Sequence, residues 1–211
     1  MSKLFDFIKT ESDEMIWALC EDLHVMILET YFGKYWKAPT TSFEHSGERL
    51  IEKINQLNPQ SVLDIGCGHN PYKGRIQNLL GVDPFNDKAD IKMTIHDYYT
   101  ANKDKQFDVV MALGSINYGS KEKILYEVDL VDKMTKPGGY QFWRVNPGHN
   151  HNNKEFPLAD LIDFFPWDKE FVYKIAEIYG YEVKEFEVDH KKDYDPNVKS
   201  EERLYFCFYK Y

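Results

Sequence analysis

The residues of this chain best suited to bind a ligand lie in and directly after one short apolar run. Residues 61–65 read Ser-Val-Leu-Asp-Ile, with Asp64 near their end, and are followed by Gly66, Cys67 and Gly68. A parallel strand delivers its carboxyl end into a nucleotide-type pocket in this way. The first glycine permits a tight turn, and the second lets the backbone approach a ligand closely. The run therefore predicts a nucleotide-type binding site at the end of a strand.

A dinucleotide-binding domain is the main alternative for this run. Its fingerprint, Gly-x-Gly-x-x-Gly, opens a helix whose N-terminus holds the pyrophosphate. Counted from Gly66, the third glycine of that fingerprint falls at Pro71. A ligand without a phosphate tolerates the looser turn, so the sequence favours such a ligand over NAD. A strand and turn with no ligand is a further interpretation, which the pattern downstream disfavours.

A second acid stands at the spacing expected for ribose recognition. Asp83 follows a short apolar run, residues 79–82, and lies 19 residues after Asp64. An acid about 20 residues beyond a glycine turn can accept hydrogen bonds from ribose hydroxyls. The alternative is an ordinary turn aspartate before Pro84.

Together these motifs resemble those of the class I S-adenosylmethionine-dependent methyltransferases. The stretch 66–71, Gly-Cys-Gly-His-Asn-Pro, is similar to motif I of that family in a variant with Asn-Pro after the glycines. Leu-Gly-Val-Asp at 80–83, Phe-Asp-Val-Val at 107–110 and Lys-Pro-Gly-Gly-Tyr at 136–140 stand where the family has later motifs. The resemblance covers about residues 58–211. It implies S-adenosyl-L-methionine as cofactor and methyl transfer as activity, which makes the protein a transferase.

The resemblance also implies roles for particular residues. Asp64 would organise the glycine loop near the amino group of the methionine moiety, where a carboxylate favours the cationic end of the ligand. Asp97 aligns with the acid that receives the exocyclic amine of adenine, and Tyr98 would stack or pack on the ring. The full set of expected cofactor-binding residues is Asp64, Gly66, Cys67, Gly68, Asn70, Asp83, Pro84, Asp97, Tyr98, Leu113 and Gly114.

Two later stretches are expected to face the methyl acceptor. Residues 112–118 end a buried strand, and Asn117 and Tyr118 are candidate substrate groups there. The stretch lacks the Asn/Asp-Pro-Pro-Tyr/Phe motif of the amino-methylating DNA enzymes. No Pro-Cys pair of a cysteine-nucleophile cytosine methylase is present either.

The second stretch, residues 144–153, follows the next strand and contains two histidines. His149 or His151 could serve as a general base if the acceptor must lose a proton. A solvated polar loop is the plainer interpretation, and a metal site is disfavoured because no carboxylate or cysteine cluster accompanies them. The expected catalytic residues are thus His149, Tyr118 and Asn117, with no metal.

Direct displacement at a sulfonium methyl needs alignment more than it needs a catalytic base. Proximity and orientation can supply on the order of 7–11 kcal/mol. The identity of the acceptor is therefore set by the shape of a pocket rather than by a catalytic motif.

Composition limits the partners and the setting. The chain has 211 residues and a net charge of −9, from 26 basic and 35 acidic residues. This balance argues against a broad basic surface for duplex nucleic acid and favours a small-molecule acceptor. Three widely spaced cysteines fit a reducing cytoplasm. The apolar stretch 15–32 contains Glu21, Asp22, His24 and Glu29, so it cannot span a membrane. The compact length and the stretch 113–118 also resemble proteins encoded by tailed phages.

The order of the segments predicts an α/β fold of the Rossmann-like methyltransferase type. Strands are expected at 61–66, 79–83, 90–95, 107–113, 140–145, 181–188 and 204–209, with helices at about 120–134 and 167–179. They predict a seven-stranded, mostly parallel sheet with an antiparallel final strand in a domain of residues 58–211.

Residues 1–57 read as a helical extension that packs on the sheet or covers the cofactor. Apolar residues at helical spacing run through 16–31, and 41–44 have the spacing of a capping box before a second helix. Tyr31, Tyr35 and Trp36 are the candidates to shape a substrate pocket. A catalytically silent cofactor-binding module for regulation or assembly, with the same fold, is the alternative function.

Overall fold

The computed structural model describes residues 23–35, 47–147, 155–162, 164–191 and 201–211. The chain divides into two compact units. One comprises residues 1–36 and 151–162, and the other comprises residues 37–150 and 163–211.

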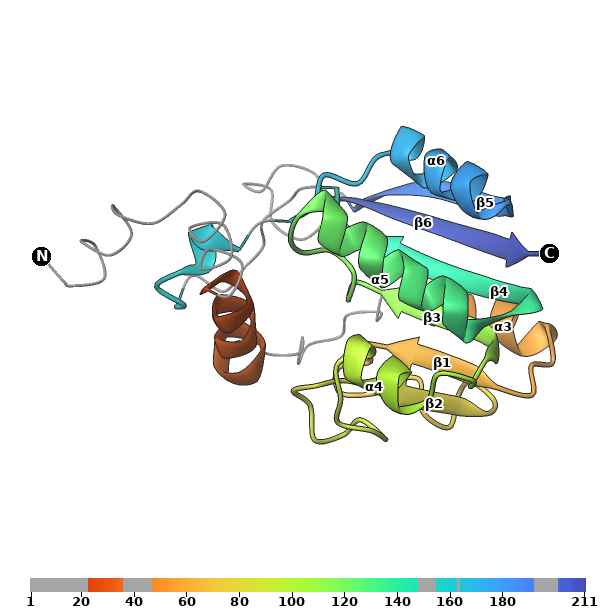
Figure 1. Cartoon of the computed structure of the whole chain (residues 1–211), viewed down its shortest axis with the longest axis horizontal. Coiled ribbons are helices and arrows are strands. Elements are labelled where there is room, and N and C mark those ends of the chain that lie inside the picture. Colours follow the sequence, from red (N-terminus) through yellow and green to blue (C-terminus); the bar gives the residue numbers. More distant parts are fainter. Residues whose placement is uncertain (1–22, 36–46, 148–154, 163, 192–200) are drawn as a thin grey trace, which may run out of the picture. The chain divides into compact units, whose positions relative to one another are not determined.

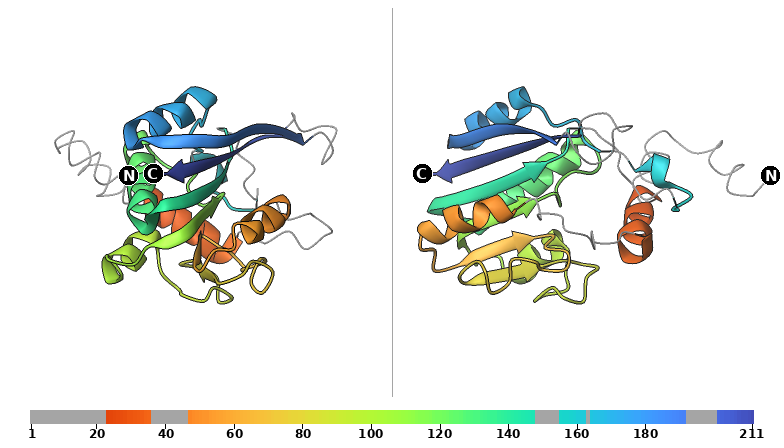
Figure 2. Two further views of the ribbon diagram at one scale, coloured as in Figure 1. Left: turned by 90° about the vertical axis from the view of Figure 1, so that its right-hand side faces the viewer. Right: turned by 180° about the vertical axis from the view of Figure 1, so that it is seen from behind.

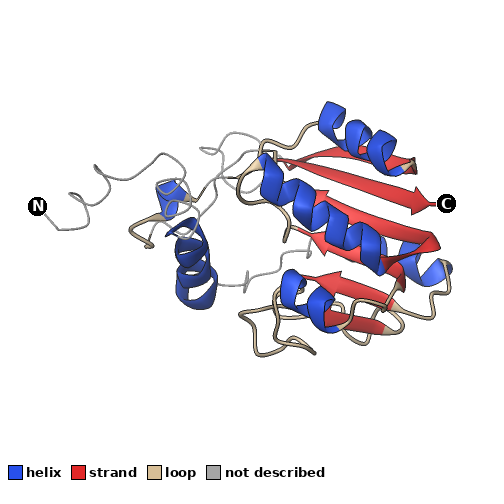
Figure 3. Ribbon diagram, viewed as in Figure 1, coloured by secondary structure: helices blue, strands red, loops and turns tan. Residues whose placement is uncertain are grey.

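The larger unit is built on a six-stranded mixed sheet in the order β2-β1-β3-β4-β6-β5 (Figures 1 and 3). Neighbours among β1 to β4 pair in parallel, and β6 pairs antiparallel with both β4 and β5. The predicted antiparallel final strand is confirmed. The strands are β1 (Val62–Ile65), β2 (Leu79–Val82), β3 (Phe107–Leu113), β4 (Thr135–Val145), β5 (Tyr181–Lys191) and β6 (Glu201–Lys210).

Helices cover the two faces of this sheet unequally, as Figure 2 shows. On one face lie α4 (Ile95–Ala101), α5 (Lys121–Met134) and α6 (Lys169–Tyr179), and on the other lies α3 (Glu48–Gln56). Because side chains alternate along a strand, Leu63 packs in the core cluster of α4, α5 and α6, whereas Val62 packs in the cluster of α3.

The ends of the helices follow signals present in the sequence. Ser120 caps α5 by accepting the Lys123 N–H, at the position where the sequence predicts the start of a helix. Asp168 caps α6 in the same manner. Gly180 ends α6 in the left-handed conformation, with φ of 68°, which favours glycine.

The expected strand at 90–95 is wrong. Only one isolated bridge, between Val82 and Ile91, forms there, and α4 begins at Ile95. Asp90 turns the chain back on β2, since its carboxylate accepts the Gly81 N–H at 2.8 Å. Thr94 then caps α4. The described residues therefore contain six strands where seven were expected.

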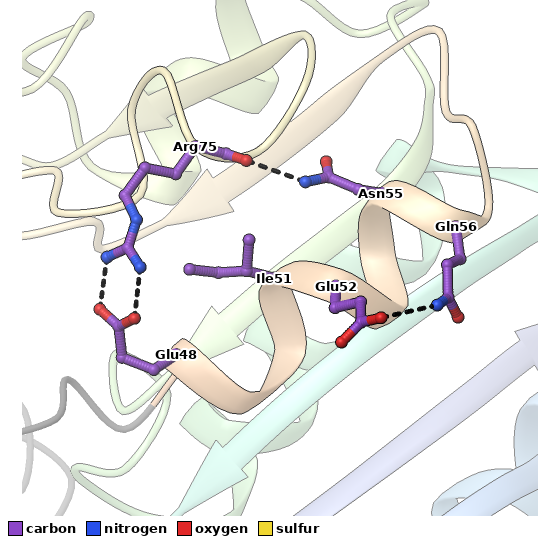
Figure 4. A pocket seen from close by; sticks show the side chains of 6 residues that line it. All are labelled: Glu48, Ile51, Glu52, Asn55, Gln56 and Arg75. Atoms are coloured by element: carbon purple, nitrogen blue, oxygen red, sulfur yellow. Dashed lines mark hydrogen bonds and ion pairs between the residues drawn. The ribbon is translucent and has the colours of Figure 1, made fainter.

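The segment between β1 and β2 contains turns and no helix, and α3 holds it in place (Figure 4). Glu48 at the start of α3 forms a two-pronged ion pair with Arg75. Asn55, near the end of α3, donates to the Arg75 carbonyl at 2.9 Å and accepts the Gln77 N–H at 3.0 Å. Glu48, Asn55 and Arg75 also line a shallow hollow on the surface beside α3. The helix thus fastens residues 75–77, which gives it a structural role.

The smaller unit contributes a short helical region. Residues 23–30 are α-helical and continue as η1 (Tyr31–Tyr35). The rings of Tyr31 and Tyr35 lie 5.6 and 4.8 Å from that of Phe156, which precedes η2 (Ala159–Leu161). The helix expected here is confirmed over 23–30. Trp36 and the capping box at 41–44 lie outside the described residues, and the role of residues 1–57 as a cap stays a prediction.

No helix in the described part of the chain has the length and apolar character needed to cross a bilayer.

Asn55→Ala should lower the free energy of unfolding by about 1–3 kcal/mol, because it leaves the Arg75 carbonyl and the Gln77 N–H without their partner. Urea unfolding measures the change. Gln56→Ala is the matched control. Among the described residues, the exposed amide of Gln56 donates only to Glu52, at 3.2 Å. The substitution should therefore change the free energy of unfolding by no more than about 0.5 kcal/mol. Equal losses in both variants would contradict the fastening role of Asn55.

Candidate functional site

The carboxyl ends of β1, β3 and β4 meet at one edge of the sheet. The chain runs from β1 outward to β2 on one side, and β3 lies on the other side of β1. Such a reversal of strand order opens a crevice beyond the strand ends, where α/β proteins bind their ligands. The predicted site residues from the glycine run and from β3 both reach this edge.

The glycine run forms a tight turn held against β2. Gly66 and Gly68 have φ of 66° and 56°, both in the left-handed region. The N–H groups of Gly66 and Cys67 both donate to the Val82 carbonyl, at 2.8 and 3.1 Å. A Cβ at position 66 would lie 2.3 Å from the Ser115 Cβ, so close approach of the two loops requires glycine there.

Asp83 anchors the same turn from the end of β2. Its Oδ2 accepts the Gly68 N–H at 3.0 Å, and its Oδ1 accepts the N–H groups of Phe85 and Asn86, each at 2.9 Å. An ionised carboxylate has about four acceptor positions. Three are used by the fold, which leaves room for about one further hydroxyl. The next residue, Pro84, is half-buried.

Asn70 and Cys67 pack beneath the turn. Asn70 is buried with φ of 58°, and its Nδ2 donates to the Lys88 carbonyl at 3.3 Å. A Cβ on Gly81 would lie 2.8 Å from both the Asn70 Oδ1 and the Cys67 Sγ. Burial, followed by the charges of Asp64, Asp83 and Asp90, raises the pKa of the Cys67 thiol. The thiol is therefore protonated and inert at neutral pH.

Asp64 is the buried carboxylate of the site, with a relative exposure of 2%. Among the described residues, no group donates a hydrogen bond to its Oδ2. Burial, and after it the charge of Asp83, raises the pKa of Asp64 to about 8. A buried acid in this state is stabilised by a ligand that brings a positive charge to it.

The ends of β3 and β4 bring an arginine to the site that the sequence analysis did not single out. The Arg144 Nη2 donates to the Leu113 carbonyl at 3.1 Å. Gly114 has φ of 100°, and a Cβ there would lie 2.6 Å from the Arg144 Nη2. The sequence signal for it was a charged residue within an aromatic-rich strand, on the same face as Tyr140 and Phe142.

Asn117 is used within the fold. It is fully buried, its Nδ2 donates to the Gly114 carbonyl at 3.0 Å, and its Oδ1 accepts the Asn146 N–H at 3.0 Å. The side chain thus joins the loop after β3 to the loop after β4. Tyr118 is half-buried, and its ring lies 4.7 Å from that of Phe164. His149 and His151 lie outside the described residues.

Asp97 and Tyr98 were expected just after a strand at 90–95. They belong instead to helix α4. Asp97 is exposed at the start of the helix, where its N–H donates to the Thr94 hydroxyl and its carboxylate accepts from it. Tyr98 is 1% exposed, and its ring lies 6.5 Å from that of Phe107 in the core. The contacts of this ring are therefore with the protein.

Within the described residues, no three His, Cys, Asp or Glu side chains are grouped so that they could hold a metal ion.

Comparison with known proteins identifies the fold. No protein-family profile matches the sequence, and no curated protein sequence matches it. Solved structures that resemble the chain include three methyltransferases. The N-methyltransferase NodS from Bradyrhizobium japonicum WM9, in complex with S-adenosyl-L-homocysteine, matches with a TM-score of 0.62 and 14% identity, over 89% of this chain and 98% of that one.

The second is the magnesium protoporphyrin IX methyltransferase ChlM from Synechocystis PCC 6803 with bound S-adenosylmethionine. It matches with a TM-score of 0.63 and 10% identity, over 89% of this chain and 97% of that one. The third, the methyltransferase domain of bacterial CtHen1-CN, has a TM-score of 0.54 and 16% identity, with coverages of 77% and 96%. The chain therefore has the predicted Rossmann-like fold of the S-adenosylmethionine-dependent methyltransferases.

Asp64→Asn should change how stability depends on pH. Between about pH 4 and pH 8 the native state keeps a proton on Asp64 that the unfolded chain has released. The free energy of unfolding therefore falls as pH rises through this window, and the neutral amide removes that fall. The variant should match the wild type near pH 4 and exceed it by a few kcal/mol at pH 8.

Urea unfolding at several pH values measures the difference between the two proteins. Asp104→Asn, which removes an exposed carboxylate, is the control and should give a difference close to zero across the range. A difference for Asp64→Asn that does not grow with pH would show that Asp64 ionises normally in the native state.

Proposed function

We propose that the protein is an S-adenosylmethionine-dependent methyltransferase whose acceptor is a small molecule. The observation that carries the proposal is the pairing of a tight glycine turn with the buried carboxylate of Asp64, whose Oδ2 has no donor among the described residues, at the strand-order reversal. An amino acid moiety with a protonated amine supplies the positive charge that this carboxylate lacks. The fold of the neighbouring structures, two of which hold S-adenosyl ligands, supports the same assignment.

The residues of the turn fit such a cofactor. Gly66 and Gly68 would let the backbone approach it, Asp64 would face its ammonium group, and Asp83 would accept from its ribose with the acceptor position that the fold leaves. When bound, the cofactor supplies a sulfonium methyl group with a good leaving group. Leu113 and Gly114 would border the reacting centre, where the protein has only to align the two partners.

The acceptor is assigned from charge. A net charge of −9 disfavours duplex nucleic acid, whose phosphates require a broad basic surface. The names of NodS and ChlM describe an N-methyltransferase and a magnesium protoporphyrin IX methyltransferase. A general base at His149 or His151 and a substrate contact at Tyr118 remain part of the proposal.

A catalytically silent cofactor-binding module is the second candidate, and the state of Asn117 favours it. Both polar groups of this side chain are bonded within the protein, so a candidate catalytic residue serves the fold. Product formation separates the two functions, because a silent module binds the cofactor without consuming it.

The setting that we propose is the reducing cytoplasm. Cys67 and Cys207 are free and buried thiols within the described residues. Burial raises the pKa of Cys207 to about 12, so it too is protonated and unreactive. A phage source rests on the sequence resemblance alone.

Ligand-induced stabilisation tests the cofactor. S-Adenosylmethionine and S-adenosylhomocysteine at about 100 times their dissociation constants should each add roughly 2.7 kcal/mol to the free energy of unfolding, and NAD should add none. Asp83→Asn should weaken S-adenosylhomocysteine about tenfold, since a charged acceptor is lost. Asp87→Asn, at an exposed carboxylate paired with Lys92, is the control and should keep wild-type affinity. A shift with NAD alone would replace this proposal with an oxidoreductase.

Proton release on binding tests the role of Asp64. At pH 7 the acid, with its pKa of about 8, is mostly protonated in the ligand-free protein, and an ammonium group beside it favours ionisation. Binding of S-adenosylhomocysteine should therefore release close to one proton. Calorimetry in buffers of different ionisation enthalpy measures this number.

5′-Methylthioadenosine, which lacks the amino acid moiety, and the Asp64→Asn variant are the two controls. Neither should release the proton. Equal release with 5′-methylthioadenosine would mean that the ammonium group does not meet Asp64.

A further inference from the structure

Arg144 occupies the half of the ligand edge that lies away from Asp64. The chain has four arginines among its 26 basic residues, and two of them, Arg144 and Arg203, lie on the neighbouring strands β4 and β6. Arg144 pairs in the sheet with Tyr205, two residues from Arg203. Two arginines thus converge at one edge of an acidic protein.

The guanidinium of Arg144 is held in place without being neutralised. Its Nη2 donates to the Leu113 carbonyl at 3.1 Å and its Nη1 to the Asn146 Oδ1 at 3.0 Å, and both acceptors are uncharged. Its Nε is buried and has no acceptor among the described residues. Within that part of the chain, no carboxylate forms an ion pair with Arg144.

Such an arrangement is unfavourable for stability by itself. Burial, and next the positive charge of Arg203, lowers the pKa of Arg144 to about 10. The side chain therefore remains charged at neutral pH. An uncompensated buried charge destabilises a fold, and its retention is typical of a functional site.

The backbone around Arg144 is shaped to receive this side chain. Gly114 holds φ of 100° and leaves the space in which the Nη2 lies, since a Cβ would come within 2.6 Å of it. Asn117 fixes the Asn146 N–H, and Asn146 in turn accepts from Arg144. The guanidinium is consequently oriented before any ligand arrives.

The charges divide the edge into two halves. At the ends of β1 and β2, the negative charge of Asp83 contributes to the raised pKa of Asp64. Near the end of β4 and the start of β6, Arg203 is the charged group with the largest effect on the pKa of Arg144. Smaller effects come from Tyr205, Tyr118 and Tyr72. The proposed function assigns the acidic half to the cofactor. The basic half then adjoins residues 113–118, where the acceptor is expected.

We infer that the methyl acceptor carries an anionic oxygen group, a carboxylate or a phosphate, and that Arg144 binds it. The inference rests on the proposed function and names the substrate class for that site. A guanidinium has five N–H donors, and the bonds to Asn146 and Leu113 use two of them, one on each Nη. The planar guanidinium with its remaining donors matches the oxygens of a carboxylate or phosphate. Arg144 is thereby a specificity residue, which selects the acceptor by its charge.

The test titrates anions into the full chain saturated with S-adenosylhomocysteine. Sodium phosphate and sodium benzoate are added separately, at an ionic strength held constant with sodium chloride, and binding is followed by calorimetry. At least one of them should bind saturably. Phosphate alone would indicate a phosphorylated acceptor, and benzoate alone a carboxylic acid.

Arg144→Gln should weaken that anion at least tenfold, and Arg144→Lys, which keeps the charge without the fork, should lie between the two. Near-ultraviolet circular dichroism checks that each variant is folded. If Arg144→Gln does not fold, the anion affinity of Arg144→Lys tests the inference in its place. Lys53→Gln is the control. It removes a half-exposed positive charge of α3 that pairs with Glu185 of β5, and it should bind like the wild type.

Three results would overturn the inference. The first is no saturable binding of either anion, and the second is equal binding in Arg144→Gln. The third is weaker S-adenosylhomocysteine but unchanged 5′-methylthioadenosine in Arg144→Gln, which would assign Arg144 to the carboxylate of the cofactor. If the wild type binds no S-adenosylhomocysteine, the proposed function fails by itself. The same anion titration on the ligand-free protein then still decides the role of Arg144.

Discussion

The attachment of the glycine turn to β2 is the constraint on which the rest of the site depends. The carbonyl of Val82 accepts two consecutive N–H groups of the turn, and the carboxylate of Asp83 accepts a third, from Gly68. These bonds satisfy backbone donors that would otherwise be left at the end of β1. They also fix the direction in which the turn faces, since the next residues cannot move without breaking them.

In this chain the turn is not followed by a helix, so its support comes from elsewhere. A helix directly after a glycine turn would cover the sheet and hold the loop by its own hydrogen bonds. Here α3, which precedes β1 in the sequence, lies on the face opposite α4, α5 and α6 and contacts the segment that follows the turn (Figure 2). Its ion pair through Glu48 and its amide bonds through Asn55 replace the missing helical contacts. The departure at Asn70 and Pro71 from the commoner glycine pattern thus has a structural counterpart.

The sequence was sufficient for the parts of the fold that local chemistry determines. Strand β3 has the predicted bounds, Ser120 and Gly180 mark helix ends, and the last strand is antiparallel. The prediction of a strand at 90–95 was wrong. The Asp90 carboxylate accepts a hydrogen bond from Gly81 and makes the chain turn there, and the periodicity of the sequence does not predict such a contact. For the site, Asp64, Asp83 and the glycines lie at the expected edge. Asn117 shows the limit, since only the fold reveals that its amide is already bonded on both sides.

The stretch 144–153 was expected to face the acceptor, but the role of Arg144 itself was not predicted, because it depends on Leu113 and Gly114, about 30 positions earlier. The sheet explains why Arg144 forms no ion pair with a carboxylate among the described residues. Direct contact between Asp64 and Arg144 would give both groups a partner within the protein and would remove the site. Strand β3 lies between their strands, so β1 and β4 are about 10 Å apart. The register adds to this separation, because Asp64 lies opposite Met111 and Arg144 lies opposite Leu113. The sheet therefore keeps the carboxyl group of Asp64 and the guanidinium of Arg144 apart at one edge, where each is oriented for a different part of what binds.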